Sequence, residues 1–341
     1  MAVVCSHMLP FAHLEIAKQL GLGAMGVEFF FLLSGFIIFY VHRLEFGAPS
    51  NLTRYAWRRA GRIFATYWFV LALVFLLTVT LVRPDTRPPV TFSFLLQNIL
   101  LLPGHHPLVT PSWTLRHELL FYALFSTFII NRAMGLIVFF AWFFAILFGF
   151  YLIGPSNVPT QTSAEIFFHH YNLDFFIGIA AAIFANKRKE MNVIAFAVPI
   201  TIILLVIWAI QGFPADSFAR VFASKAGFLA LLGISIALSR STIRAPGALL
   251  LLGSASYSIY LANRNVGLLF GRALGRLGGD ALVDSWWSFL LSVALAAALG
   301  IAIFLLYEQR VLRWVNSRPW ALRREVAHGA SREEAENGTG K

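Results

Sequence analysis

Long apolar runs separated by short polar segments constrain this chain more than any other feature. Nine of them approach the roughly 20 residues that a helix needs to cross a bilayer. They fall at about 23–42, 63–82, 112–130, 134–153, 166–186, 191–211, 218–239, 247–269 and 285–307. Hydrophobic residues make up 58% of the 341 residues and charged residues 13%, which is too little polar surface for a soluble protein of this size. The sequence therefore predicts an all-α, polytopic integral membrane protein.

Two further apolar segments are too short to cross a bilayer alone. Residues 92–104 number about 13, so we expect a re-entrant or interfacial segment there. The opening residues, "MAVVCSHMLP", read as the second half of a spanning helix. They show neither the basic leading region nor the small-residue cleavage site of a signal peptide. We therefore expect a truncated first helix and about ten transmembrane helices in total.

The basic residues between the apolar runs predict the orientation. If successive helices alternate in direction, the segments on one side hold 16 Lys and Arg and those on the other side hold five. The positive-inside rule places the richer group, which includes 43–62 and 308–324, in the cytoplasm. Both termini are then cytoplasmic. Residues 1–324 form one membrane domain, and the polar, aperiodic residues 325–341 are expected to form a disordered cytoplasmic tail.

Charge and cysteine content exclude several classes of function. The net charge of +11 is explained by topology, because neither a Gly-rich phosphate loop nor a basic stripe with interleaved aromatics accompanies it. We therefore expect no nucleic-acid partner. A single cysteine, Cys5, excludes an intramolecular disulfide framework and a Cys-based zinc site. His105 and His106 are adjacent, but their segment holds no carboxylate or cysteine, so we expect no metal.

Ionisable residues inside the apolar runs are the candidate functional residues, because a bilayer interior penalises each of them. They either carry function or pair with one another as structural contacts. The set is His7, Glu28, Arg116, His117, Glu118, Asp174, Lys225 and Arg264.

His7 and Glu28 form the first candidate site. Both fall in the outer halves of adjacent predicted helices joined by a short loop, which allows them to meet. A carboxylate beside an imidazole fixes its tautomer and raises its basicity, as a general base acting on a hydroxyl requires. The alternative is a histidine satisfied by a backbone carbonyl.

An arginine cluster leads into the next helix, in "RYAWRRAGRIFATYW", 54–68. Arg58 and Arg62 are four apart and share a helix face, and Arg59 neighbours Arg62 at a spacing of three. Such a cluster either anchors the topology or binds a phosphorylated donor from the cytoplasm, since guanidinium binds phosphate through two parallel hydrogen bonds.

Glu118 lies in "PSWTLRHELLFYALF", 111–125, about two turns into a helix for which Ser112 is a suitable start. Glu118 and Tyr122 share a face at a spacing of four, whereas Arg116 faces elsewhere. The partner of this buried carboxylate must therefore come from another helix.

These segments together resemble the acyltransferase 3 family of integral membrane O-acyltransferases, which includes bacterial O-antigen and exopolysaccharide acetylases. "AVVCSHML" is similar to the end of the family's first helix with its histidine, and "GVEFFFLLSGFII" to its Gly-Val-acid-x-Phe-Phe-x-x-Ser-Gly-Phe signature. "RRAGRIFATYW" is similar to Arg-Arg-x-x-Arg-Ile-x-Pro-x-Tyr-Trp, and "PSWTLRHELLFY" to Ser-Trp-Ser-Leu-x-x-Glu-x-x-Phe-Tyr. "LDFFIGIAAA" and "LGSASYSIYLANRNV" match later segments. The resemblance runs in order along nearly the whole chain.

The resemblance implies roles for particular residues. His7 would be the catalytic histidine and Glu28 its acidic companion, and Glu118, the buried glutamate of the third motif, would be a further catalytic residue. Arg58 and Arg62 would be the arginines on the donor side.

Arg59 belongs to the same arginine cluster, so we expect it to bind the donor as well. The resemblance implies acetyl-CoA or another acyl-CoA as a cytoplasmic donor, without a metal. The expected acceptor is a hydroxyl of a glycan, such as an exopolysaccharide, a lipopolysaccharide or a lipid-linked sugar. Membrane lipids are the remaining expected partners, and the expected location is the bacterial inner (plasma) membrane, with several passes.

Some positions depart from the family pattern. The family's arginine eleven positions before its histidine would precede Met1, the proline after the arginines is Ala65, and the histidine after "YSIYL" is Asn263. Glu308 matches the acid of a Glu-x-Pro motif whose proline is absent. An inactive relative retained as a partner in an assembly complex is therefore one alternative.

Another alternative is a transporter or exporter of small organic acids or lipid-linked sugars, which ten spans with a few buried charges would also serve. No inverted repeat supports it. A His-His-x-x-x-Asp match at 169–174 is interpreted as coincidence, because the acyltransferases with that pattern are soluble α/β proteins.

Overall fold

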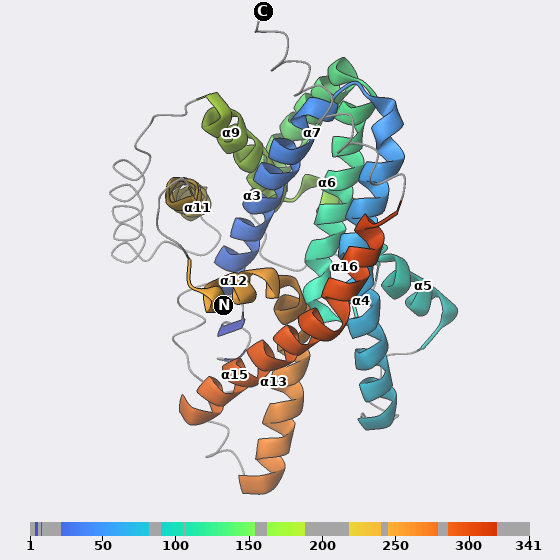
Figure 1. The fold of residues 1–341 in the computed structure, drawn as a ribbon, viewed down its shortest axis with the longest axis vertical. Helices are drawn as coiled ribbons and strands as arrows, with labels where there is room; N and C mark the ends of the chain where they lie inside the picture. The colour runs from blue at the N-terminus through green and yellow to red at the C-terminus, as the bar shows by residue number, and fades with distance from the viewer. Residues whose placement is uncertain are drawn as a thin grey trace, which may run out of the picture.

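The computed structural model describes residues 4–5, 8, 22–81, 90–104, 107–153, 162–187, 218–239, 245–278 and 286–318. Within these ranges the chain is helical and no strand occurs, so the predicted all-α class is confirmed for this part (Figure 1). The predicted base His7, the predicted span 191–211 and the tail 325–341 lie outside the described residues.

Twelve α-helices occur in the described part of the chain. They are α3 Leu22–His42, α4 Leu52–Leu81, α5 Phe92–Leu100, α6 Trp113–Ile130, α7 Arg132–Ile153, α8 Ser163–Phe168, α9 Leu173–Lys187, α11 Phe218–Ser239, α12 Gly247–Ser254, α13 Ser256–Gly278, α15 Trp286–Ile303 and α16 Gln309–Asn316. α3 packs against α9, α6 against α7 and α4, and α13 against α15. Figure 1 shows α3, α6, α7 and α9 in the upper half and α13 and α15 in the lower half, while α4 runs along one side from the upper half down to the level of α13 and α15.

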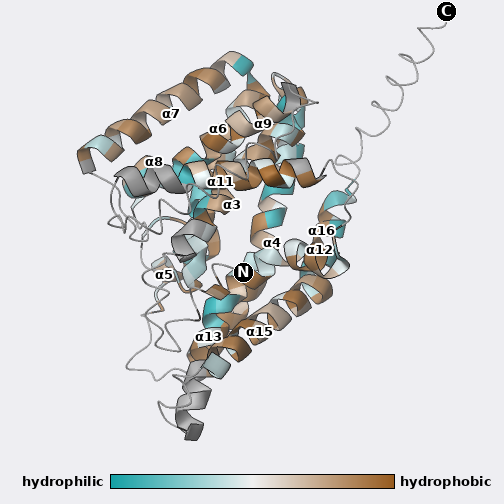
Figure 2. Ribbon diagram, turned by 90° about the vertical axis from the view of Figure 1, so that its left-hand side faces the viewer, coloured by the Kyte–Doolittle hydropathy of each residue, from teal (hydrophilic) through white to brown (hydrophobic). Residues whose placement is uncertain are grey.

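Four helical segments in the described part are long and apolar enough to cross a membrane: Gly26–Glu45, Pro49–Thr80, Arg132–Leu152 and Trp286–Asn316. Figure 2 shows hydrophobic residues along most of α7 and α15. On α7 the side chains of Phe140, Phe144 and Phe148 recur every four residues and are more than 60% exposed, as a lipid-facing stripe requires. The chain is therefore a membrane protein, while the count of ten spans and the cytoplasmic termini remain predictions.

The predicted span 166–186 is wrong as a single helix. The chain leaves the helix at His169, forms a short 3-10 turn, and restarts as α9 at Leu173. The side chain of Asn172 causes the break: its Nδ2 donates to the carbonyls of Ile166 and Phe167. These bonds satisfy carbonyls at the end of α8 that would otherwise need a continuing helix.

The predicted span 247–269 is also divided, because a turn at Ala255 separates α12 from α13. The amide of Ala255 donates to the carbonyls of Leu251 and Gly253, which closes the end of α12.

The segment predicted to be too short for a span contains α5, a helix of nine residues that is capped by the Thr91 hydroxyl. Nine residues rise about 14 Å, roughly half of a bilayer core, so α5 is short, as predicted.

α3 and α9 approach each other at two glycines. A Cβ on Gly178 would overlap the carbonyl oxygen of Leu32, and a Cβ on Gly35 would overlap that of Phe175. Only glycine permits such contact of two helix backbones, as in tightly packed membrane helix pairs. This contact fixes the rotation of α3, whose other face lines the site described next.

Candidate active site

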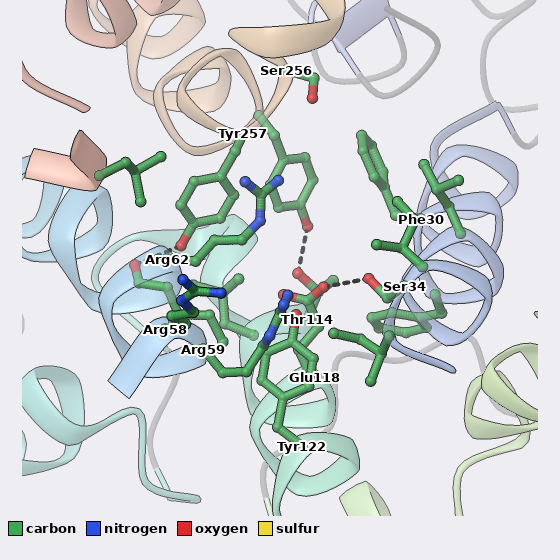
Figure 3. A pocket seen from close by; sticks show the side chains of 18 of the residues that line it. Phe30, Ser34, Arg58, Arg59, Arg62, Thr114, Glu118, Tyr122, Ser256 and Tyr257 are labelled. Carbon is green, nitrogen blue, oxygen red and sulfur yellow. Dashed lines mark hydrogen bonds between the residues drawn. The ribbon is translucent and has the colours of Figure 1, made fainter. Parts of the chain in front are cut away.

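A cavity of about 530 Å³ lies between α3, α4, α6, α13 and α16. Figure 3 shows the arginines of α4 on one side of it, Glu118 and Tyr122 of α6 at its floor, and Ser34 of α3 opposite. We call it the arginine cavity, after Arg58, Arg59 and Arg62, which all line it. Arg58 and Arg62 share a face of α4, as predicted, and Arg59, predicted to neighbour Arg62, lines the same cavity.

The charge in the cavity favours an anion. Among its described lining residues, three arginines face one acid, Glu118. Guanidinium groups at helical spacing can grip phosphate oxygens through paired hydrogen bonds. The arginine cavity is thus suited to a phosphorylated ligand.

Arg59 is held by a chain of buried side chains at the end of α3. Its Nη2 donates to His42 Nε2 at 3.1 Å, so the proton of the neutral ring is on Nδ1, which donates to Glu45 at 3.0 Å. Glu45 also accepts from Arg54 Nη2 at 2.9 Å. Arg54 therefore supports the network behind the cavity.

Glu118 finds its partner on another helix, as predicted. The hydroxyl of Ser34 on α3 donates to Glu118 Oε1 at 2.7 Å, and Arg59 and Arg62 lie within electrostatic range of the same carboxylate. Tyr122, predicted to share the face of Glu118, also lines the cavity. Sequence reasoning did not select Ser34, although it is the serine of the signature that "GVEFFFLLSGFII" resembles and a hydroxyl within an apolar run.

Two tyrosines of α13 complete the wall and tie that helix to its neighbours. The Tyr257 hydroxyl donates to the Ile63 carbonyl on α4 at 2.8 Å. The Tyr260 hydroxyl donates to the Pro111 carbonyl at 2.9 Å and lies 2.9 Å from Thr114 Oγ1 on α6. Both tyrosines line the arginine cavity. Sequence reasoning did not select them, although a spacing of three residues places them on one face.

The cavity is elongated along α3. Val27, Phe31, Ser34 and Ile38 line it, and they recur with the helical period. Val27 and Ile38 are eleven positions apart, which corresponds to a rise of about 17 Å along the helix. Because Arg59 bonds to His42 at the C-terminal end of α3, the arginines lie toward one end and Val27 lies toward the other.

Glu28 is buried but is not among the residues that line the cavity. It lies on the neighbouring face of α3, with its Oε2 3.7 Å from Lys225 Nζ on α11. The same ammonium donates to Asp174 Oδ1 on α9 at 2.8 Å. The predicted contact between Glu28 and His7 falls outside the described residues.

Two further positions singled out from the sequence, Asn263 and Glu308, are also buried. Asn263, which replaces the histidine of the family pattern, donates to the Tyr260 carbonyl at 2.8 Å. Glu308 ends a π-helical turn and accepts from the Ser258 hydroxyl at 2.5 Å. The described part of the chain holds no group of three or more His, Cys, Asp or Glu that could bind a metal ion.

Comparisons with known proteins place the chain among acyltransferases. The profile of a family described as an acyltransferase domain, acyltransferase 3, matches residues 1–305. The chain is 25% identical over 312 residues to the exopolysaccharide production protein ExoZ of Rhizobium meliloti (strain 1021). The matched region covers 87% of this chain and 92% of that protein. No solved structure matches the chain.

Proposed function

This chain belongs to the acyltransferase 3 family and is an O-acyltransferase, and from that premise we propose that it moves an acetyl or other small acyl group from cytoplasmic acyl-CoA to a sugar hydroxyl. The acceptor is a cell-surface polysaccharide or its lipid-linked precursor. The similarity to a protein of exopolysaccharide production supports this acceptor. The proposed location is the bacterial inner membrane, with several passes.

The arginine cavity is the observation that carries the proposal. Its arginines gather toward one end, and its walls continue about 17 Å along α3 to Val27. Acyl-CoA is an elongated molecule with phosphates at one end and a thioester at the other. We propose that Arg58, Arg59 and Arg62 bind the phosphates, so that the thioester points toward Val27 and its neighbour Glu28.

The proposed transfer needs a base and no metal. The acceptor oxygen forms a bond to the thioester carbonyl carbon, the carbon–sulfur bond breaks, and the hydroxyl proton passes to His7 and then to the departing CoA thiolate. Glu28 orients the histidine. Glu118 accepts from Ser34 and lies near Arg59 and Arg62, so its proposed role is to hold the arginines against the donor.

Labelled donor tests the proposal directly. Membranes containing the chain are given acetyl-CoA labelled with ¹³C in the acetyl group, together with chemically deacetylated exopolysaccharide from the source organism. We expect an O-acetyl signal in the polysaccharide NMR spectrum, and none with membranes containing His7→Ala at equal protein level. Absence of transfer from acetyl-, propionyl- and succinyl-CoA, with unchanged O-acylation in a deletion strain, would refute it.

A further inference from the structure

The strongest feature outside the arginine cavity is a buried ion cluster made of Glu28, Asp174 and Lys225. Its three members come from α3, α9 and α11. Lys225 Nζ lies 2.8 Å from Asp174 Oδ1 and 3.7 Å from Glu28 Oε2. Their side chains are between 0% and 7% exposed. An isolated charge at such a depth is costly, so each of these groups needs its partners.

The packing of α11 holds Lys225 in this place. Lys225, Phe228 and Leu232 recur with the helical period and face α3, where Phe228 and Leu232 pack with Leu32. The rings of Phe29 and Phe228 lie 6.1 Å apart. The glycine contact between α3 and α9 fixes the other two members of the cluster. The ammonium is therefore held by three packed helices.

The cluster holds one more acid than a structural ion pair requires. Asp174 already gives Lys225 a hydrogen-bonded partner. Glu28 places a second carboxyl group 3.7 Å from the same ammonium, so one buried lysine faces two buried acids. Burying a second carboxylate does not follow from a need for stability.

Glu28 also occupies a special position on α3. It follows Val27, which lines the arginine cavity at the end away from His42. Glu28, Leu32 and Gly35 form one face of α3, and Val27, Phe31 and Ser34 form the adjacent face, one residue or about 100° away. The carboxylate therefore lies beside the end of the cavity where the thioester is proposed to arrive.

We propose that Lys225 is a positioning residue for acyl transfer: its ammonium, anchored by Asp174, holds the Glu28 carboxylate beside the end of the arginine cavity. This inference rests on the proposed function, in which Glu28 orients the base. Asp174 fixes Lys225, and Lys225 fixes Glu28. Neither Asp174 nor Lys225 needs to touch the acyl group or the acceptor.

Substitutions that separate the charge balance of the buried cluster from the positioning of Glu28 test this proposal. Lys225→Met leaves two buried carboxylates without their ammonium, so we expect less folded protein. For the folded fraction we expect kcat to fall about 100-fold, the scale of a misplaced catalytic group, while KM for acetyl-CoA changes little. The double variant Lys225→Met with Asp174→Asn removes one charge of each sign, so it should restore folded yield while kcat stays low.

Two further variants complete the experiment. Lys225→Arg keeps a cation in reach of both carboxylates and should recover most of kcat. Leu229→Met is the matched control, because Leu229 lies one turn further along α11 with its side chain 44% exposed. Rates are measured with acetyl-CoA and deacetylated exopolysaccharide, per amount of monodisperse protein in size-exclusion chromatography.

The outcomes distinguish the inference from the function beneath it. Recovery of kcat together with folded yield in the double variant would show that the cluster is only structural and would overturn the inference. So would full kcat in the folded fraction of Lys225→Met. If the unmodified chain transfers no acyl group from acyl-CoA, the proposed function itself fails, whatever the variants do.

Discussion

The three arginines of the cavity extend from one helix into the same space. Arg59 donates to His42, which donates to Glu45, so its direction is fixed from behind. Arg58 and Arg62 extend from the same face of α4 into the space between α6 and α13 (Figure 3). Three arginines on one wall of the cavity suit a ligand with more than one phosphate, because each guanidinium can bind two oxygens.

Replacement of single arginines by lysine tests this assignment. Arg58→Lys and Arg62→Lys keep the charge and lose the paired hydrogen bonds. One charge-assisted hydrogen bond contributes about 2 kcal/mol, so we expect KM for acetyl-CoA to rise at least tenfold and kcat to change less. Steady-state kinetics with varied acetyl-CoA measure both.

Arg313→Lys on α16 is the matched control, because the Arg313 side chain is exposed and donates within its own helix. Its kinetics should equal those of the unmodified chain. Equal KM values for Arg58→Lys, Arg62→Lys and Arg313→Lys would contradict a donor site in the arginine cavity.

Among the helices, the pair α3 and α9 depends most on single residues. Gly178→Ala places a methyl group where the Leu32 carbonyl lies, so the helices must separate. Overpacking of this kind costs about 2 kcal/mol, and we expect a lower midpoint of thermal unfolding in detergent. Because α3 also carries Glu28 and Ser34, the folded fraction should lose activity as well.

Gly227→Ala on α11 supplies the comparison. A Cβ at Gly227 meets nothing within 4 Å, and alanine favours a helix over glycine by about 1 kcal/mol. The unfolding midpoint should therefore stay or rise. A midpoint for Gly178→Ala equal to that of Gly227→Ala would show that the two helices do not depend on the glycine contact.

The sequence predicted helices well wherever one apolar run ends at a polar signal. α3 and α7 begin and end within two residues of the predicted runs. Their starts and ends follow the apolar runs, because the length of an apolar run matches the thickness of the membrane that the helix crosses. The breaks at His169 and Ala255 were not predicted. At His169 the cause is a bond from the Asn172 side chain to carbonyls of the preceding turn, and run length carries no information about such a bond.

For the whole molecule, the predicted topology can be tested with single cysteines. In a Cys5→Ser background, Ser50→Cys and Ser317→Cys lie in segments predicted to be cytoplasmic, and Val90→Cys and Ser163→Cys lie in segments predicted to be outside. All four side chains are exposed. We expect a membrane-impermeant maleimide on intact cells to label only the second pair, and labelling of Ser50→Cys there would contradict the topology.

For the site as well, the sequence predicted relations within one helix but not contacts between distant helices. Helical spacing was enough to group Arg58, Arg59 and Arg62, since all three belong to one helix. It was also enough to require that the partner of Glu118 come from another helix. The pairing of Lys225 with Glu28 joins residues nearly two hundred positions apart, and only the packing of α11 against α3 decides it.

The two adjacent faces of α3 have a consequence for how this chain can change during evolution. Inserting one residue between Glu28 and Ser34 would rotate Glu28 by about 100° relative to Ser34. Either Glu28 would leave Lys225 or Ser34 would leave Glu118. The six-residue interval between Glu28 and Ser34 should therefore be constant among active relatives, while the loops between helices vary freely in length.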